Sequence, residues 1–98
     1  MNRFFRAYES EYNRMLSLFN EYLSLPSNGQ ENAFDTIEYA KKDSNNRYYV
    51  AISTEDISYD IIKNILDDLL NKNEIEEIDQ TAYILLTRNI PNNYDNTH

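Results

Sequence analysis

The feature that most constrains the fold is a set of apolar residues between positions 57 and 70 that recurs at steps of three and four. On a helix these side chains cover an arc of about 220°, much wider than the apolar stripe of a surface helix. Such a helix must be packed deeply, so other elements are needed to cover it. The residues are Ile57, Ile61, Ile62, Ile65, Leu66, Leu69 and Leu70.

The same segment carries signals for both of its ends. Ser53 or Thr54 can cap the N-terminus, and Glu55 and Asp56 then fall in the first turn, where the helix dipole favours anions. We expect the helix to end near residues 71–73, where an asparagine can take the left-handed conformation.

Residues 3–24 also have a helical period, and we predict one long helix there. Its apolar side chains fall within an arc of about 120°, as in an amphipathic helix. Residues 26–29 (Pro-Ser-Asn-Gly) have the composition of a turn that ends it. The apolar face consists of Phe4, Phe5, Tyr8, Tyr12, Met15, Leu16, Phe19, Tyr22 and Leu23.

The remaining apolar segments favour strands. Residues 48–52 are aromatic and β-branched, and residues 34–40 can pair with them across a polar loop at 41–46. Residues 34–40 also fit a short helix. Residues 74–78 and 81–87 suggest a second hairpin that turns at Asp79 and Gln80.

These elements predict an α+β fold of order αββαββ, with the helices packed on an antiparallel sheet. The chain of 98 residues is expected to form one domain over residues 1–90, followed by a flexible polar tail over residues 91–98. A chain this small is also compatible with a homodimer.

Composition excludes several kinds of site. The chain has no Cys, which excludes disulfides and thiolate metal sites, and its single Gly29 excludes glycine-rich phosphate loops. No apolar run approaches the length of a membrane span, and we expect a cytoplasmic protein. We expect no metal or other cofactor, and no enzymatic activity, because no His, Lys or glycine-rich loop stands beside the carboxylates to complete a catalytic site.

The net charge of −8 is concentrated in one part of the chain. Residues 1–50 hold seven acidic and six basic residues, a net charge of −1. Residues 51–80 hold nine acidic residues against Lys63 and Lys72, a net charge of −7. The imbalance therefore lies in the second predicted helix and the strand after it.

On a helical wheel Asp56, Asp60 and Asp67 share one narrow polar strip, with Tyr59 at its margin. This strip is either an ordinary solvated face or a surface that binds a partner protein with a basic surface. In the second interpretation the carboxylates supply charge and Tyr59 anchors the contact. The predicted partner-binding residues are Asp56, Tyr59, Asp60, Asp67, Glu74, Glu76 and Glu77.

Residues 65–70 (Ile-Leu-Asp-Asp-Leu-Leu), followed by Glu74, Ile75 and the apolar residues 83–87, resemble the last helix and wing of a winged helix-turn-helix domain. That resemblance implies a regulatory or assembly module, dimeric through the first helix. Acidic residues stand where contacts to phosphates require Arg or Lys, so the module would act through protein contacts.

In overall character the chain is similar to small phage-encoded inhibitors of bacterial defence, of the anti-CRISPR and anti-restriction type. It shares with them small size, acidity, the absence of Cys and a high content of Asn and Tyr. The similarity implies a nucleic-acid mimic that acts in the host bacterial cytoplasm on a nucleic-acid-binding enzyme. We expect no direct binding of nucleic acid and no membrane association.

Overall fold

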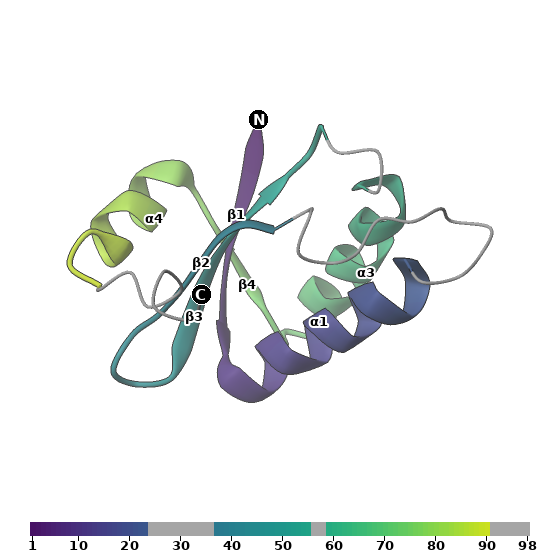
Figure 1. Ribbon diagram of the computed structural model, residues 1–98, viewed down its shortest axis with the longest axis horizontal. Coiled ribbons are helices and arrows are strands. Elements are labelled where there is room, and N and C mark those ends of the chain that lie inside the picture. The colour runs from purple at the N-terminus through teal and green to yellow at the C-terminus, as the bar shows by residue number, and fades with distance from the viewer. Residues whose placement is uncertain (24–36, 56–58, 91–98) are drawn as a thin grey trace, which may run out of the picture.

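The computed structural model describes residues 1–23, 37–55 and 59–90. These described residues form an α+β fold with three helices and a four-stranded antiparallel sheet in the order β2-β3-β1-β4. The elements follow one another as β1 (Asn2–Tyr8), α1 (Glu9–Leu23), β2 (Ile37–Lys42), β3 (Arg47–Ser53), α3 (Tyr59–Asn71), β4 (Glu76–Ile78) and α4 (Gln80–Thr87). Figure 1 shows α1 and α3 on one side of the sheet and α4 on the other.

The main core lies between the sheet and the pair formed by α1 and α3. Phe5, Val50 and Ile52 point from β1 and β3 towards these helices and are fully buried. Met15 and Phe19 of α1 are also fully buried, together with Ile62, Leu66 and Leu69 of α3. The wide apolar arc of α3 is explained by this position, because the helix contacts both the sheet and α1.

A smaller core lies on the opposite face of the sheet, under α4. Tyr49, Ala51 and Tyr83 are buried there, and Phe4 packs against them with its ring centroid 4.9 Å from that of Tyr83. Both faces of the sheet are therefore covered, and the consecutive residues Tyr48 and Tyr49 both pack. The Tyr48 ring stacks on that of Tyr12 at 4.0 Å between centroids, whereas Tyr49 faces α4.

The prediction of a helix was correct for residues 9–23 and wrong for residues 3–8, which form β1. This strand pairs along its whole length with β3, from Asn2 opposite Ser53 to Tyr8 opposite Arg47. Strands buried on both faces lose the simple alternation of apolar and polar residues. Phe4 and Phe5 point to opposite faces of the sheet, and both faces are covered. Two adjacent apolar residues therefore occur in this strand, and they also fit the apolar stripe of a helix.

The prediction of a strand at residues 81–87 was also wrong, because this segment forms α4. Asp79 is its N-cap, and its carboxylate accepts a hydrogen bond from the backbone N–H of Ala82 at 2.7 Å. The helix packs through Tyr83 and Thr87 and leaves three aliphatic side chains 41–55% exposed: Ile84, Leu85 and Leu86. Apolar residues thus surround α4, and such a short run does not distinguish a helix from a strand.

The hairpin of β2 and β3 is confirmed, and the helix alternative is excluded for residues 37–40. The predicted loop at 41–46 is too long, because Lys41 and Lys42 pair with β3 as the end of β2. The segment 74–78 does contain a strand, but β4 pairs with β1 and not with residues 81–87. The wing implied by the winged-helix resemblance is consequently not formed. Residues 34–36 and the tail at 91–98 lie outside the described residues, as does Ile57.

The second predicted helix is confirmed as α3, and Asn73 beyond its end has the expected positive φ of 59°. The proposed cap was wrong, since Ser53 ends β3 and α3 begins at Tyr59. Thr54 instead donates two hydrogen bonds to the carbonyl of Met1, one from its backbone N–H at 3.0 Å and one from its hydroxyl at 2.8 Å.

The cap of α4 provides a test of this architecture. Replacing Asp79 with Ala leaves the Ala82 N–H without its acceptor, and we expect the free energy of unfolding to fall by about 1 kcal/mol. Asp79→Asn retains an acceptor oxygen and should recover most of the loss. Urea unfolding followed by circular dichroism measures both values. Equal stability of Asp79→Ala and the wild type would contradict the capped helix.

Candidate functional site

The exposed carboxylates of α3 form the first part of the predicted binding surface. Asp60 and Asp67 are both exposed, and in the described part of the chain neither has an ion-pair partner. Asp68 is exposed as well, and it pairs with Lys72 one turn later at 3.0 Å. Asp56 lies outside the described residues.

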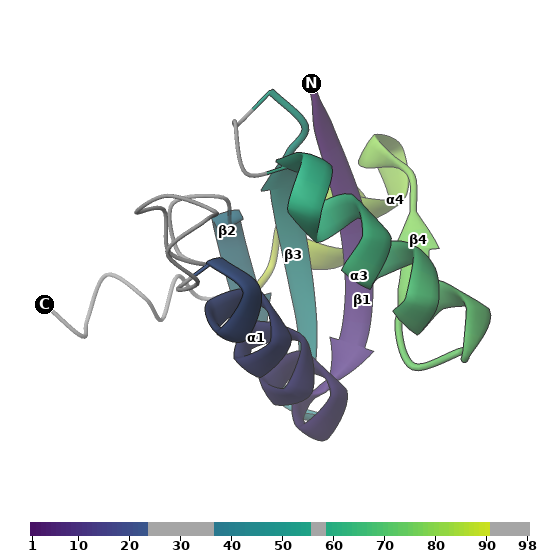
Figure 2. The ribbon, with the colours of Figure 1, turned by 90° about the vertical axis from the view of Figure 1, so that its right-hand side faces the viewer.

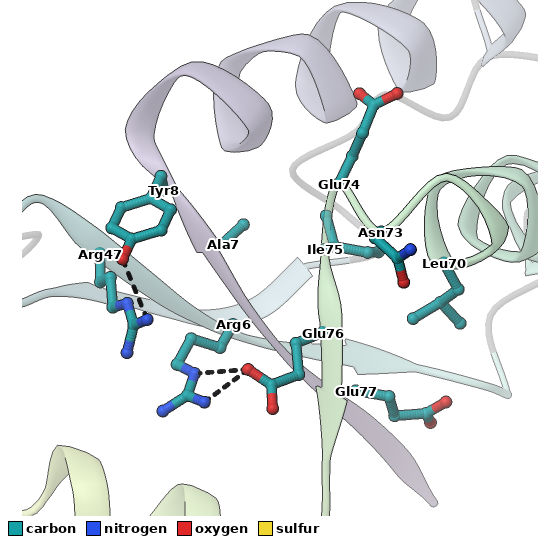
Figure 3. A pocket seen from close by; sticks show the side chains of 10 residues that line it. All are labelled: Arg6, Ala7, Tyr8, Arg47, Leu70, Asn73, Glu74, Ile75, Glu76 and Glu77. Carbon is teal, nitrogen blue, oxygen red and sulfur yellow. Dashed lines mark hydrogen bonds and ion pairs between the residues drawn. The ribbon is translucent and has the colours of Figure 1, made fainter.

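The three predicted glutamates around β4 are instead paired with arginines of the same chain. Arg3 contacts both carboxylate oxygens of Glu77, with nitrogen–oxygen distances of 2.8 and 2.9 Å. Arg6 pairs with Glu76 on the opposite face of the sheet, with its Nε 3.0 Å from the carboxylate (Figure 3).

The third pair joins Arg14 of α1 to Glu74, in the segment that connects α3 with β4. In these three pairs, arginines of β1 and α1 neutralise the glutamates of residues 74–77. Among the described residues, the predicted carboxylates without an ion-pair partner are therefore those of α3.

Tyr59 also belongs to this internal network. Its hydroxyl accepts a hydrogen bond from a terminal nitrogen of Arg3 at 2.9 Å, and its side chain packs against the main core. Tyr59 thus connects the start of α3 to the Arg3–Glu77 pair. The ring of Tyr59 therefore has a structural role in the fold and does not project outward as an anchor for a partner.

The electrostatics of the Arg3–Glu77 pair are reciprocal. The hydrogen bond from Arg3 lowers the pKa of the Glu77 carboxyl below its usual value of 4.5, against the opposing effect of partial burial. The hydrogen bond to Glu77 likewise raises the pKa of Arg3. The pair therefore holds both groups in their charged forms.

A second cluster, which the sequence did not indicate, surrounds the end of β1. Arg47 of β3 donates a hydrogen bond to the Tyr8 hydroxyl at 3.1 Å, and its guanidinium carbon lies 4.8 Å from the centroid of the Tyr8 ring. Both side chains border a hollow of about 480 Å³ together with Arg6 and Glu76 (Figure 3). Two arginines and three glutamates line it, so it carries charges of both signs.

The β2–β3 turn is held by Asp43. Its carboxylate accepts hydrogen bonds from the backbone N–H groups of Asn45 and Arg47 and from the Tyr49 hydroxyl. Burial acts to raise the pKa of Asp43, but these donors outweigh it and the pKa is lowered. Burial and the neighbouring Asp43 raise the pKa of Tyr49. These groups are occupied in holding the turn.

A groove of about 520 Å³ lies between α1 and α3, and it contains one predicted residue, Asp60. Its other charged side chain is Asp68, and its apolar part comes from both helices. The groove could not be recognised in the sequence, because it forms where α1 and α3 pack together, and β2 and β3 lie between these helices along the chain.

Across residues 1–23, 37–55 and 59–90, no group of three or more His, Cys, Asp or Glu residues is arranged to hold a metal ion. Over the same residues, no helix combines the length and apolar character needed to cross a bilayer.

The pKa of Glu77 leads to a prediction about acid stability. A lowered pKa in the folded state means that ionised Glu77 stabilises the fold above pH 4.5, and this stabilisation is lost as the pH falls through the lowered value. Glu77→Gln should therefore reduce the free energy of unfolding by about 1 kcal/mol at neutral pH, with solvent screening of this part-exposed pair included. In strong acid the difference from wild type should vanish.

Urea unfolding at several pH values measures this difference. Asp67→Asn is the matched control, because it removes a carboxylate of α3 that has no ion-pair partner among the described residues. A Glu77→Gln deficit that stayed constant down to strong acid would show that the ion pair is not its cause.

Comparisons with known proteins complete the description of the site. No protein-family model, curated protein sequence or solved structure matches this chain. The functional conclusion therefore rests on the distribution of charge and apolar surface over the described residues.

Proposed function

We propose that this protein is a non-enzymatic binding protein whose acidic α3 face contacts a basic surface on a partner protein. The observation that carries the proposal is the contrast between two groups of carboxylates. Glu74, Glu76 and Glu77 are paired with arginines of the same chain. Asp60 and Asp67 are exposed on α3 and have no such pair among the described residues.

This contrast favours contact with a cation over an internal structural role for the two aspartates. Their side chains lie seven positions apart, which places them on one side of α3 and about 10 Å apart along its axis. Unneutralised carboxylates attract a positively charged surface and raise the rate of its association. They repel phosphate, so nucleic acid is a competitor for the same partner and not a ligand of this chain.

The partner class we favour is an enzyme that handles DNA or RNA, such as a CRISPR or restriction nuclease. Such enzymes hold a polyanion in a basic groove, and a line of carboxylates can occupy that groove in place of the phosphates. In this proposal the protein inhibits the enzyme by excluding its substrate.

The test compares two double variants that change the net charge equally. Asp60→Asn with Asp67→Asn removes the carboxylates of the proposed surface, and Glu9→Gln with Glu11→Gln removes two from the first turn of α1. Each protein is immobilised, incubated with a bacterial lysate and eluted first with duplex DNA and then with increasing salt. Any nuclease eluted by DNA is purified and assayed for cleavage with each variant added.

We expect the α3 variant to bind and inhibit that nuclease about tenfold more weakly, since each factor of ten corresponds to about 1.4 kcal/mol. The α1 variant should behave like wild type. Binding should also weaken steeply with ionic strength. Equal inhibition by all three proteins, or the absence of any protein that DNA displaces, would count against the proposal.

A further inference from the structure

The groove between α1 and α3 combines apolar side chains from both helices with an acidic wall from α3. α1 supplies Leu18 and Tyr22, which are one turn apart, and α3 supplies Ile61 and Ile65 at the same spacing. The acidic wall is formed by α3 residues in successive turns: the carboxylates of Asp60 and Asp68, with the amide of Asn64 between them. Figure 2 shows α1 and α3 side by side over the sheet, with this junction facing the viewer.

The apolar part of the groove is accessible from outside. Tyr22 is 43% exposed, and Leu18 and Ile61 are partly buried against the main core. A volume of about 520 Å³ falls within the range of sites that accept small ligands, and it accommodates a few side chains of a partner but not a whole helix. The occupant that fits is therefore a segment that inserts apolar anchors.

The charges of the groove select that segment further. Asp60 and Asp68 are eight positions apart on α3, which corresponds to about 12 Å along the axis. Within the described residues, the one ion pair of Asp68 is with Lys72, and the side chains of Lys72 and Asp68 are 50% and 56% exposed. Exposed pairs of this kind contribute little stability, so an incoming cation can replace Lys72.

We propose that the groove binds a basic amphipathic peptide segment of the partner. One or two apolar side chains of that segment enter between Leu18, Ile61 and Ile65. Lys or Arg side chains about 12 Å apart bind Asp60 and Asp68. The inference rests on the proposed function, because it describes how the same acidic helix recognises its partner. Anionic lipid surfaces and nucleic acids are excluded by the same carboxylates.

The probe is a fluorescently labelled synthetic peptide of about 14 residues, built from Leu and Lys with Leu at helical spacing. A peptide of the same composition in scrambled order is the control for amphipathic character. Affinity is measured by fluorescence anisotropy, and circular dichroism verifies that each variant is folded. We expect the amphipathic peptide to bind about tenfold more tightly than the scrambled one, because only the first can insert Leu while its Lys residues face the acidic wall.

Variants of the groove should weaken this binding and those elsewhere should not. We expect Asp60→Asn with Asp68→Asn, and separately Ile61→Gln, to reduce the affinity by about tenfold. Lys72→Gln frees Asp68 and should increase the affinity severalfold. Two controls leave the groove intact: Glu9→Gln with Glu11→Gln in the first turn of α1, and Leu85→Gln on α4, which is 55% exposed.

Three results would overturn the inference. They are no binding of the amphipathic peptide, equal binding of the scrambled one, and equal losses from a control variant (the Glu9 and Glu11 double variant or Leu85→Gln) and from the groove variants. The last result with the Glu9 and Glu11 double variant would indicate attraction to negative charge in general, and the nuclease assay would then decide the proposed function by itself. A failed lysate and nuclease assay, with groove binding intact, would instead count against the proposed function alone.

Discussion

The pairing of β1 with both of its neighbours is the constraint on which the rest of the structure depends. β1 is the one strand that joins the β2–β3 hairpin to β4, and it pairs antiparallel with both. It also contributes to the two cores, with Phe5 on the side of α1 and α3 and Phe4 on the side of α4. Without β1, β4 would have no strand to pair with, and α4, which follows β4, would lose the part of its packing surface that Phe4 supplies.

The sequence predicted those elements whose local signals agree with their packing. The period and breadth of the apolar positions identified α3, and the turn residues between two apolar segments identified the β2–β3 hairpin. It failed at residues 3–8 and 81–87, where the apolar pattern is compatible with either a helix or a strand. Tertiary contacts decide these two segments, and they reverse the two predictions. Only the Asp79 cap was a local signal that could have indicated α4.

The acidic charge of the candidate site was predictable from the sequence, but the ion pairs that its glutamates form with arginines were not. The excess of acidic residues after position 50 is visible in the sequence, and Asp60 and Asp67 are exposed as expected. The partners of Glu76 and Glu77 are Arg6 and Arg3, seventy or more positions away, and only the sheet register brings them together. The apolar side of the α1–α3 groove likewise requires the packing of two distant helices. A count of charges therefore overestimates the acidic surface.

The long separation between β1 and its partners has a consequence for how the chain reaches this structure. During synthesis β1 emerges well before β3 and long before β4. Its apolar side chains are therefore exposed to solvent until its partner strands have been made. Contacts of such high sequence separation slow folding, because the entropy of closing long loops must be overcome before the contacts form. Arg3 and Arg6, on either side of Phe4 and Phe5, keep positive charge on this segment, and that charge opposes its association with other nascent chains.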